Sequence, residues 1–168
     1  MILRNPLNFI IQFLKITSKQ LKNIYLNSNY YDKKISNINN NNFFEYKPSP
    51  HLLSSILKYQ KKKYKIEDFA LDSMWQSKIN LEDYKKLNNF FWFFSLDLKS
   101  SKKKTQSIIT NWINKNNRFD KKSWEFDLTA KRIISWLSNH QLTYEDSNSE
   151  FKIKFNYSIQ KQANHLLN

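Results

Sequence analysis

Glycine and cysteine are both absent from this chain of 168 residues, and proline occurs only three times. Without glycine a glycine-rich phosphate loop cannot form, and tight turns must use Asn, Asp or Ser. Without cysteine, disulfides and thiolate metal sites are excluded, and redox chemistry indicates no compartment. The histidines, aspartates and glutamates show no metal-ligand spacing, and no G-x-S-x-G nucleophile motif is present. We therefore predict no metal and no cofactor.

Long apolar runs and export signals are also lacking. No stretch approaches the roughly 20 apolar residues that a transmembrane helix needs. The apolar segment 7–16 is short, Gln12 and Lys15 interrupt it, and no small-residue cleavage site follows. We predict neither a transmembrane span nor a clear signal peptide. The compartment stays open between a bacterial cell envelope and the cytoplasm.

Positive charge is abundant: 28 basic and 14 acidic residues give a net charge of +14. Such an excess is typical of proteins that bind nucleic acid or an anionic surface. However, nearly all the basic residues are Lys, which has AT-rich codons, as do Asn, Ile, Phe and Tyr. Part of the charge therefore reflects biased coding DNA. The remainder favours an acidic partner, and an acidic polysaccharide fits as well as a nucleic acid.

The chain divides into three segments. Residues 1–25 predict an amphipathic helix that either packs on its own domain, which we favour, or docks on a membrane surface or a partner. Residues 26–50 predict an irregular linker arm, with Asn39–Asn42 as a low-complexity patch and prolines that exclude a helix near residue 50. Residues 51–168 predict the N-terminal part of an α/α helical domain. The apolar stripe of the first helix comprises Leu7, Ile10, Ile11, Leu14, Leu21, Ile24 and Tyr25.

Helical periodicity is strong from residue 80 onward and predicts antiparallel helical hairpins joined by short polar loops. One helix is expected from an Asn80 cap to Leu98, and another around residues 105–113. A third is expected from an Asp127 cap to about Asn139, and a fourth after a capping box formed by Ser147 and Glu150. Nothing in the sequence stops the last helix, so we expect further helices to follow. The predicted buried stripe of the third helix is Ala130, Ile133, Ile134 and Leu137.

Four residues of that third helix, Thr129, Arg132, Trp136 and His140, fall within an arc of about 80° beside the predicted core stripe. An arginine fork binds carboxylate or sulfate, and an indole offers a flat face to a sugar ring. Arg132, Trp136 and His140 are therefore candidates for binding an acidic sugar. The alternative, which we favour, is that Trp136 packs against a neighbouring helix and Arg132 bonds to carbonyls or a nearby Asp.

Two other places are weighed as sites. Trp75 stands alone in polar sequence and is a further candidate for substrate binding. Asn164 and His165 form a pair of the kind seen in active sites. They are adjacent on one predicted helix and point about 100° apart, so they do not converge. We therefore predict no catalytic residue in this chain.

The order of these features resembles the N-terminal helical domain of heparinase II/III-like proteins, which are polysaccharide lyases and their relatives. The resemblance covers roughly the last half to two-thirds of the chain. It rests on F-F-W-F-F-S-L-D-L at 90–98, I-I-T-N-W-I at 108–113, W-E-F-D-L-T-A-K-R-I-I-S-W-L at 124–137 and F-N-Y-S-I-Q-K-Q-A-N-H-L at 155–166.

The resemblance implies an all-α fold, namely an incomplete (α/α) toroid preceded by the amphipathic helix and the arm. In the family, further helices and a C-terminal β-sandwich follow, and they supply the groups that cleave uronic-acid polysaccharides by β-elimination. This chain would then contribute to an acidic polysaccharide groove and be inactive alone. The alternative, from a different class, is a small basic helical module that binds nucleic acid or an anionic membrane surface.

Overall fold

A computed structural model describes residues 6–37, 81–96 and 102–168 of the chain. These ranges are mostly helical and contain no β-strand, which confirms the all-α prediction for the part of the chain described. Residues 51–80 of the predicted α/α domain lie outside them. The elements are α1 (Pro6–Leu26), α2 (Asn29–Ser36), α4 (Leu81–Asn88), the 3-10 helix η2 (Phe91–Ser95), α5 (Lys102–Lys115), α6 (Phe126–Ser138), α7 (His140–Thr143) and α8 (Ser149–Leu167).

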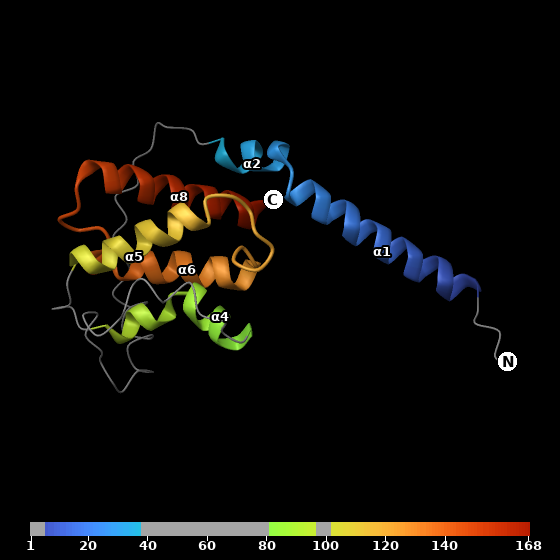
Figure 1. Cartoon of the computed structure of the whole chain (residues 1–168), viewed down its shortest axis with the longest axis horizontal. Coiled ribbons are helices and arrows are strands. Elements are labelled where there is room, and N and C mark those ends of the chain that lie inside the picture. Colours follow the sequence, from blue (N-terminus) through green and yellow to red (C-terminus); the bar gives the residue numbers. More distant parts are fainter. Residues whose placement is uncertain (1–5, 38–80, 97–101) are drawn as a thin grey trace.

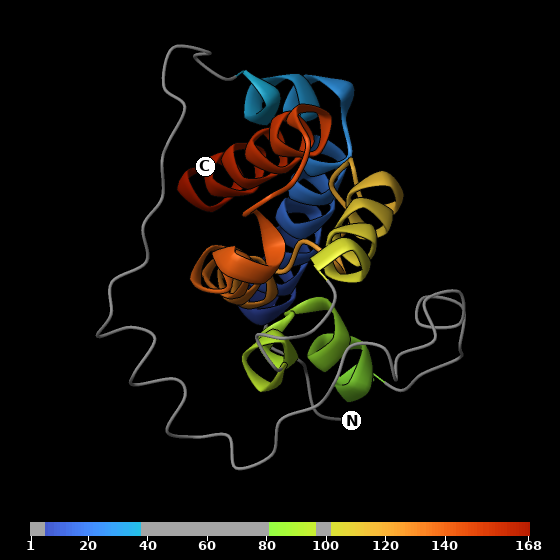
Figure 2. The same ribbon diagram turned by 90° about the vertical axis from the view of Figure 1, so that its left-hand side faces the viewer.

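Helices α5, α6 and α8 form the body of the molecule and run alternately in opposite directions (Figure 1). Helix α2 covers α8 on one side, and α4 with η2 covers α6 on the other, so α2, α8, α6 and α4 follow one another across the body (Figure 2). The predicted antiparallel helical hairpins are therefore present in the described ranges.

Aromatic side chains dominate the main core, which lies between η2, α5, α6 and α8. The Trp112 and Trp136 rings meet edge to face with centroids 5.5 Å apart, and Phe90 meets Trp136 in the same way at 5.2 Å. Such pairs contribute about 0.5–1.5 kcal/mol each beyond the burial of their area. The buried members are Phe90, Phe93, Leu96, Ile108, Ile109, Trp112, Trp136, Leu142, Phe151 and Phe155.

The helix expected from Asn80 to Leu98 is broken, and that prediction was wrong in its extent. Helix α4 ends at Asn88, and Phe90 takes a left-handed conformation with φ of 59° before η2 begins. The break exposes backbone carbonyls that a continuous helix would use. Side chains of α6 bind two of them: Arg132 donates to the Asn88 carbonyl at 3.0 Å, and the Ser135 hydroxyl donates to that of Phe90.

The arm expected over residues 26–50 is helical at its start, which corrects the irregular assignment for that part. Helix α2 begins after Ser28, whose hydroxyl caps it by accepting from the Tyr31 amide at 3.1 Å. Tyr31 and Ile35 of α2 are fully buried and form a second cluster with Trp124. The linker prediction missed this helix because only two of its residues, Tyr31 and Ile35, are buried.

Two predicted caps were also wrong. Helix α6 follows Glu125, not Asp127, and Asp127 in the first turn pairs with Lys131 at 2.8 Å. Helix α8 is capped by Asn148, whose side-chain oxygen accepts from the Phe151 amide at 2.8 Å. Because Asx and Ser side chains cap helices about equally well, sequence alone does not choose between neighbouring candidates.

The amphipathic helix expected over residues 1–25 is present as α1, but it does not pack on the body. Figure 1 shows that α1 joins the start of α2 and extends away from the bundle. Its apolar stripe is exposed to solvent along its length. The favoured prediction of a helix packed on its own domain was therefore wrong. None of the described helices is long and apolar enough to cross a membrane.

Candidate functional site

The buried face of α6 is not the apolar stripe that periodicity predicted. Ile134 is 37% exposed, and Ala130, Ile133 and Leu137 are only half-buried. The face turned to the core is instead largely polar, with Leu128, Thr129, Arg132, Ser135, Trp136 and Ser138 buried. The two faces of α6 were thus assigned the wrong way round, and the arc carrying Arg132 and Trp136 is the core face.

Arg132 lies at the centre of the body and is completely buried. Its Nη1 donates to the carbonyls of Asn88 and Ser123, both at 3.0 Å. Its Nε donates to the Gln162 side-chain oxygen at 2.6 Å, and Nη2 donates to the Thr129 hydroxyl at 3.2 Å. One guanidinium therefore joins α4, the loop before α6, α6 itself and α8.

The Arg132 guanidinium also stacks on the Trp112 ring, 3.9 Å from its centroid. Burial lowers the pKa of Arg132 to about 9, which leaves it charged at neutral pH. The oxygens that bind it are carbonyl, amide and hydroxyl groups. This is the packing role proposed as the alternative to sugar binding, and it keeps Arg132 away from any external ligand in this structure.

Trp136 is also fully buried, between Phe90, Trp112 and Phe155. Its Nε1 is buried and has no hydrogen-bond partner. An unpaired buried N–H costs about 1–3 kcal/mol, which the aromatic contacts must offset. The flat face expected to receive a sugar ring is therefore covered by other side chains of the core.

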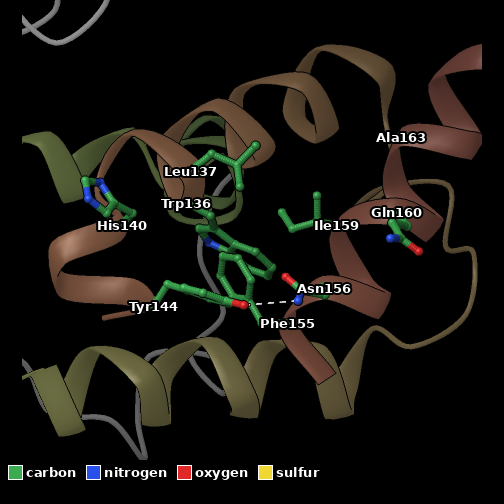
Figure 3. Close-up of a pocket in the computed structure, with 9 residues that line it drawn as sticks. All are labelled: Trp136, Leu137, His140, Tyr144, Phe155, Asn156, Ile159, Gln160 and Ala163. Atoms are coloured by element: carbon green, nitrogen blue, oxygen red, sulfur yellow. Dashed lines mark hydrogen bonds between the residues drawn. The ribbon is translucent and has the colours of Figure 1, made fainter. Parts of the chain in front are cut away.

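A pocket of about 210 Å³ lies between α6 and α8, and Figure 3 shows the side chains that surround it. Its walls are mainly apolar, and the Asn156 amide crosses one end to donate to the Tyr144 hydroxyl at 3.1 Å. We call this pocket the α6–α8 groove. It is lined by Trp136, Leu137, His140, Tyr144, Phe155, Asn156, Ile159, Gln160 and Ala163.

The groove brings together two of the four predicted site residues, Trp136 and His140. His140 lies at its margin with Nε2 2.9 Å from the Glu145 carboxylate, while its Nδ1 is buried without a partner. Arg132 does not line the groove, and Trp75 lies outside the described residues. An apolar pocket with one histidine at its edge suits apolar side chains better than a charged sugar.

Sequence reasoning missed most of the groove. Ile159 and Ala163 of α8 are half-buried at the groove wall. Tyr144 gave no periodic signal because it follows the short helix α7. One feature of the sequence did point to the groove, because α6 carries an apolar stripe in addition to Trp136.

Asn164 and His165 hold α2 onto α8. The Asn164 amide donates to the Ile35 carbonyl at 2.9 Å. His165 Nε2 lies 2.8 Å from the Trp124 carbonyl, which can only accept, so Nε2 carries the proton. His165 Nδ1 then accepts from the Tyr31 hydroxyl at 2.6 Å. Both residues are thus used in packing.

His165 is also packed among rings, with Phe126 stacked on it at 4.9 Å. Burial lowers its pKa, and the nearby charge of Arg132 acts in the same direction. A neutral imidazole satisfies both hydrogen bonds, whereas an imidazolium would present a second donor to the Tyr31 oxygen. The two hydrogen bonds of His165 therefore favour its neutral form in the folded chain.

Within residues 6–37, 81–96 and 102–168, no group of three or more His, Asp or Glu side chains is placed to hold a metal ion. No protein-family model, no curated protein and no solved structure matches this chain.

Proposed function

We propose that this chain is the N-terminal helical part of a heparinase II/III-like polysaccharide lyase, and that it has no complete active site of its own. Support comes from the order of the tryptophan-, arginine- and histidine-containing motifs between residues 90 and 166. The alternating helices α5, α6 and α8 are the arrangement from which an (α/α) toroid is built. The toroid itself is part of this proposal.

The observation that carries the proposal is the α6–α8 groove. In stacked helical hairpins, each pair leaves an apolar face that the next pair must cover. Leu137, Ile159 and Ala163 form such a face, and Ile134 beside them is 37% exposed. We propose that a further helical hairpin of the same protein packs into the groove and continues the toroid.

The structure changes what Arg132 and Trp136 would do in such an enzyme. Both are fully buried, so neither would touch the polysaccharide from its present position. Arg132 would instead hold α4, α6 and α8 in place, and α6 would in turn form one wall of the groove. His140 at the groove margin stays a candidate for a polar contact, because its side chain is 27% exposed.

The first test is the reading frame beyond the codon for Asn168. The proposal expects an open frame that encodes more helices and a β-rich domain. The longer product should release unsaturated uronate from an acidic polysaccharide, measured by ultraviolet absorbance, while the 168-residue chain should not. A stop codon at this point, an unrelated continuation, or a longer product without eliminase activity would each contradict the proposal.

The groove is then tested in the longer product with a matched pair of substitutions on α8. Ile159→Lys places a charge at the groove wall, whereas Ile153→Lys changes the same residue type at a position 61% exposed and outside the groove. We expect Ile159→Lys to abolish a single cooperative melt and the lyase activity, and Ile153→Lys to leave both unchanged. Equal behaviour of the two variants would show that no hairpin occupies the groove.

A second candidate function is binding to an anionic membrane surface. The exposed apolar face and the lysines of α1 favour it. This function involves a different part of the molecule from the groove, so both functions are compatible in one protein.

A further inference from the structure

Helix α1 presents an unusually large apolar surface to solvent. It extends from the body for 21 residues, or about 32 Å at the rise of an α-helix (Figure 1). A contiguous apolar surface of this kind marks an interaction site. Nine of its large apolar side chains are between 42 and 71% exposed: Leu7, Phe9, Ile10, Ile11, Phe13, Leu14, Ile16, Leu21 and Ile24.

The charges of α1 are arranged on a separate face. At 100° per residue, Lys15, Lys19 and Lys22 fall within an arc of about 60°. The centre of that arc lies about 120° from the line through Leu14 and Leu21. The helix contains no Asp or Glu. A wide apolar face with Phe and Leu opposite a lysine face is the pattern of helices that lie in a membrane interface.

We propose that α1 binds in the plane of an anionic lipid bilayer, with its apolar face in the acyl-chain boundary and its lysines among the headgroups. This inference rests on the second candidate function and specifies how α1 would perform it, and it does not depend on the polysaccharide proposal. The long lysine side chains reach from the flank of the helix to the headgroups, while the helix backbone lies deeper in the bilayer than the headgroups.

Further positive charge lies where α1 meets the body. Lys33 and Lys34 of α2 are exposed and follow the end of α1 by a few residues. Helix α2 is joined to α8 through Asp32, whose carboxylate accepts from Lys161 Nζ at 2.8 Å. A bilayer-bound α1 would therefore hold the whole helical body close to the membrane.

The distribution of charge favours a bilayer over the other partners. A nucleic acid would pair with the lysines but would leave the apolar face of α1 in water. A second copy of α1 would cover the apolar face, but it has no acidic side chain to pair with the lysines. Of these three partners, an anionic bilayer satisfies both faces at once, through burial and through lipid phosphate or carboxylate groups.

The test is flotation of the full chain with phosphatidylcholine vesicles that contain or lack phosphatidylserine. The wild-type chain should float with the phosphatidylserine vesicles and bind the neutral ones much more weakly. Leu14→Gln with Leu21→Gln keeps helix propensity and removes two apolar anchors, and we expect it to lower the affinity by about 100-fold. A similar loss is expected when Lys15, Lys19 and Lys22 are all replaced by Gln.

The matched control replaces three exposed lysines of the body, Lys103, Lys121 and Lys122, by Gln. It removes the same net charge, so the control should float like the wild type if α1 is the binding element. Thermal melts should be unchanged in all variants, because these side chains do not pack on the core.

Four outcomes would overturn the proposal. The wild-type chain could fail to float, the leucine variant could bind vesicles like the wild type, or the control triple could lose as much affinity as the α1 triple. If the control triple loses as much affinity, the positive charge of the whole chain attracts polyanions in general. Duplex DNA should then bind the variants in the same order of affinity as the vesicles do. A dimer in sedimentation velocity that the leucine variant abolishes would assign α1 to a second copy instead.

Discussion

Replacing Arg132 by alanine tests whether this residue holds the fold together or binds a ligand. The change would leave three buried oxygen atoms without a donor, those of Asn88, Ser123 and Gln162. Each unpaired acceptor costs about 1 kcal/mol or more. Loss of the guanidinium stacked on Trp112 adds about 1 kcal/mol. We therefore expect the free energy of unfolding to fall by about 4 kcal/mol.

That loss is large against the roughly 5–15 kcal/mol by which a domain of this kind is stable. The assay is urea unfolding followed by tryptophan fluorescence. The control is Lys131→Ala, one residue earlier on α6, which removes a half-exposed pair with Asp127 and should cost less than about 1 kcal/mol. If Arg132→Ala unfolds within about 1 kcal/mol of the wild type, the structural role argued for Arg132 is wrong.

Three further predictions concern other contacts. Because burial lowers the pKa of His165 below its ordinary 6.5, stability should be full above that pH and fall as the pH drops below it; a pH series of urea melts that stays flat from neutral to acid would contradict this. Tyr31→Phe removes the hydroxyl that donates to His165 and should weaken the docking of α2 on α8, so hydrogen exchange of backbone amides should be faster in α2 than in α8. Asn148→Ala should cost about 1 kcal/mol as a lost helix cap, whereas Ile134→Ser on the exposed side of α6 should cost about half as much or less, both measured by urea melts.

Several elements could be predicted from local pattern. The apolar residues of α1 and α5 recur at helical spacing, and both helices lie close to where the spacing placed them. These predictions succeed because side-chain period and helix geometry are linked within a few residues, whatever the rest of the chain does.

The candidate site could not be predicted in the same way. Periodicity placed Ile134 and Leu137 in the core and Arg132 beside it, and the structure reverses the two faces. The reason is the break after Asn88, which leaves backbone carbonyls that need donors. Arg132 and Ser135 supply these donors, and burying those bonds places the polar face of α6 inside.

The sequence by itself determined that the described part of the chain is helical, that its first helix has an apolar and a basic face, and that thiolate sites and glycine loops are impossible. Only the tertiary structure decided which face of α6 is buried, that α2 docks on α8, and that α1 stands away from the body. Those outcomes depend on contacts between distant positions, such as Arg132 with Asn88, 44 residues apart, and Tyr31 with His165, 134 residues apart. Local propensity acts over a few residues, so it carries no information about which distant carbonyl or hydroxyl a buried side chain will meet.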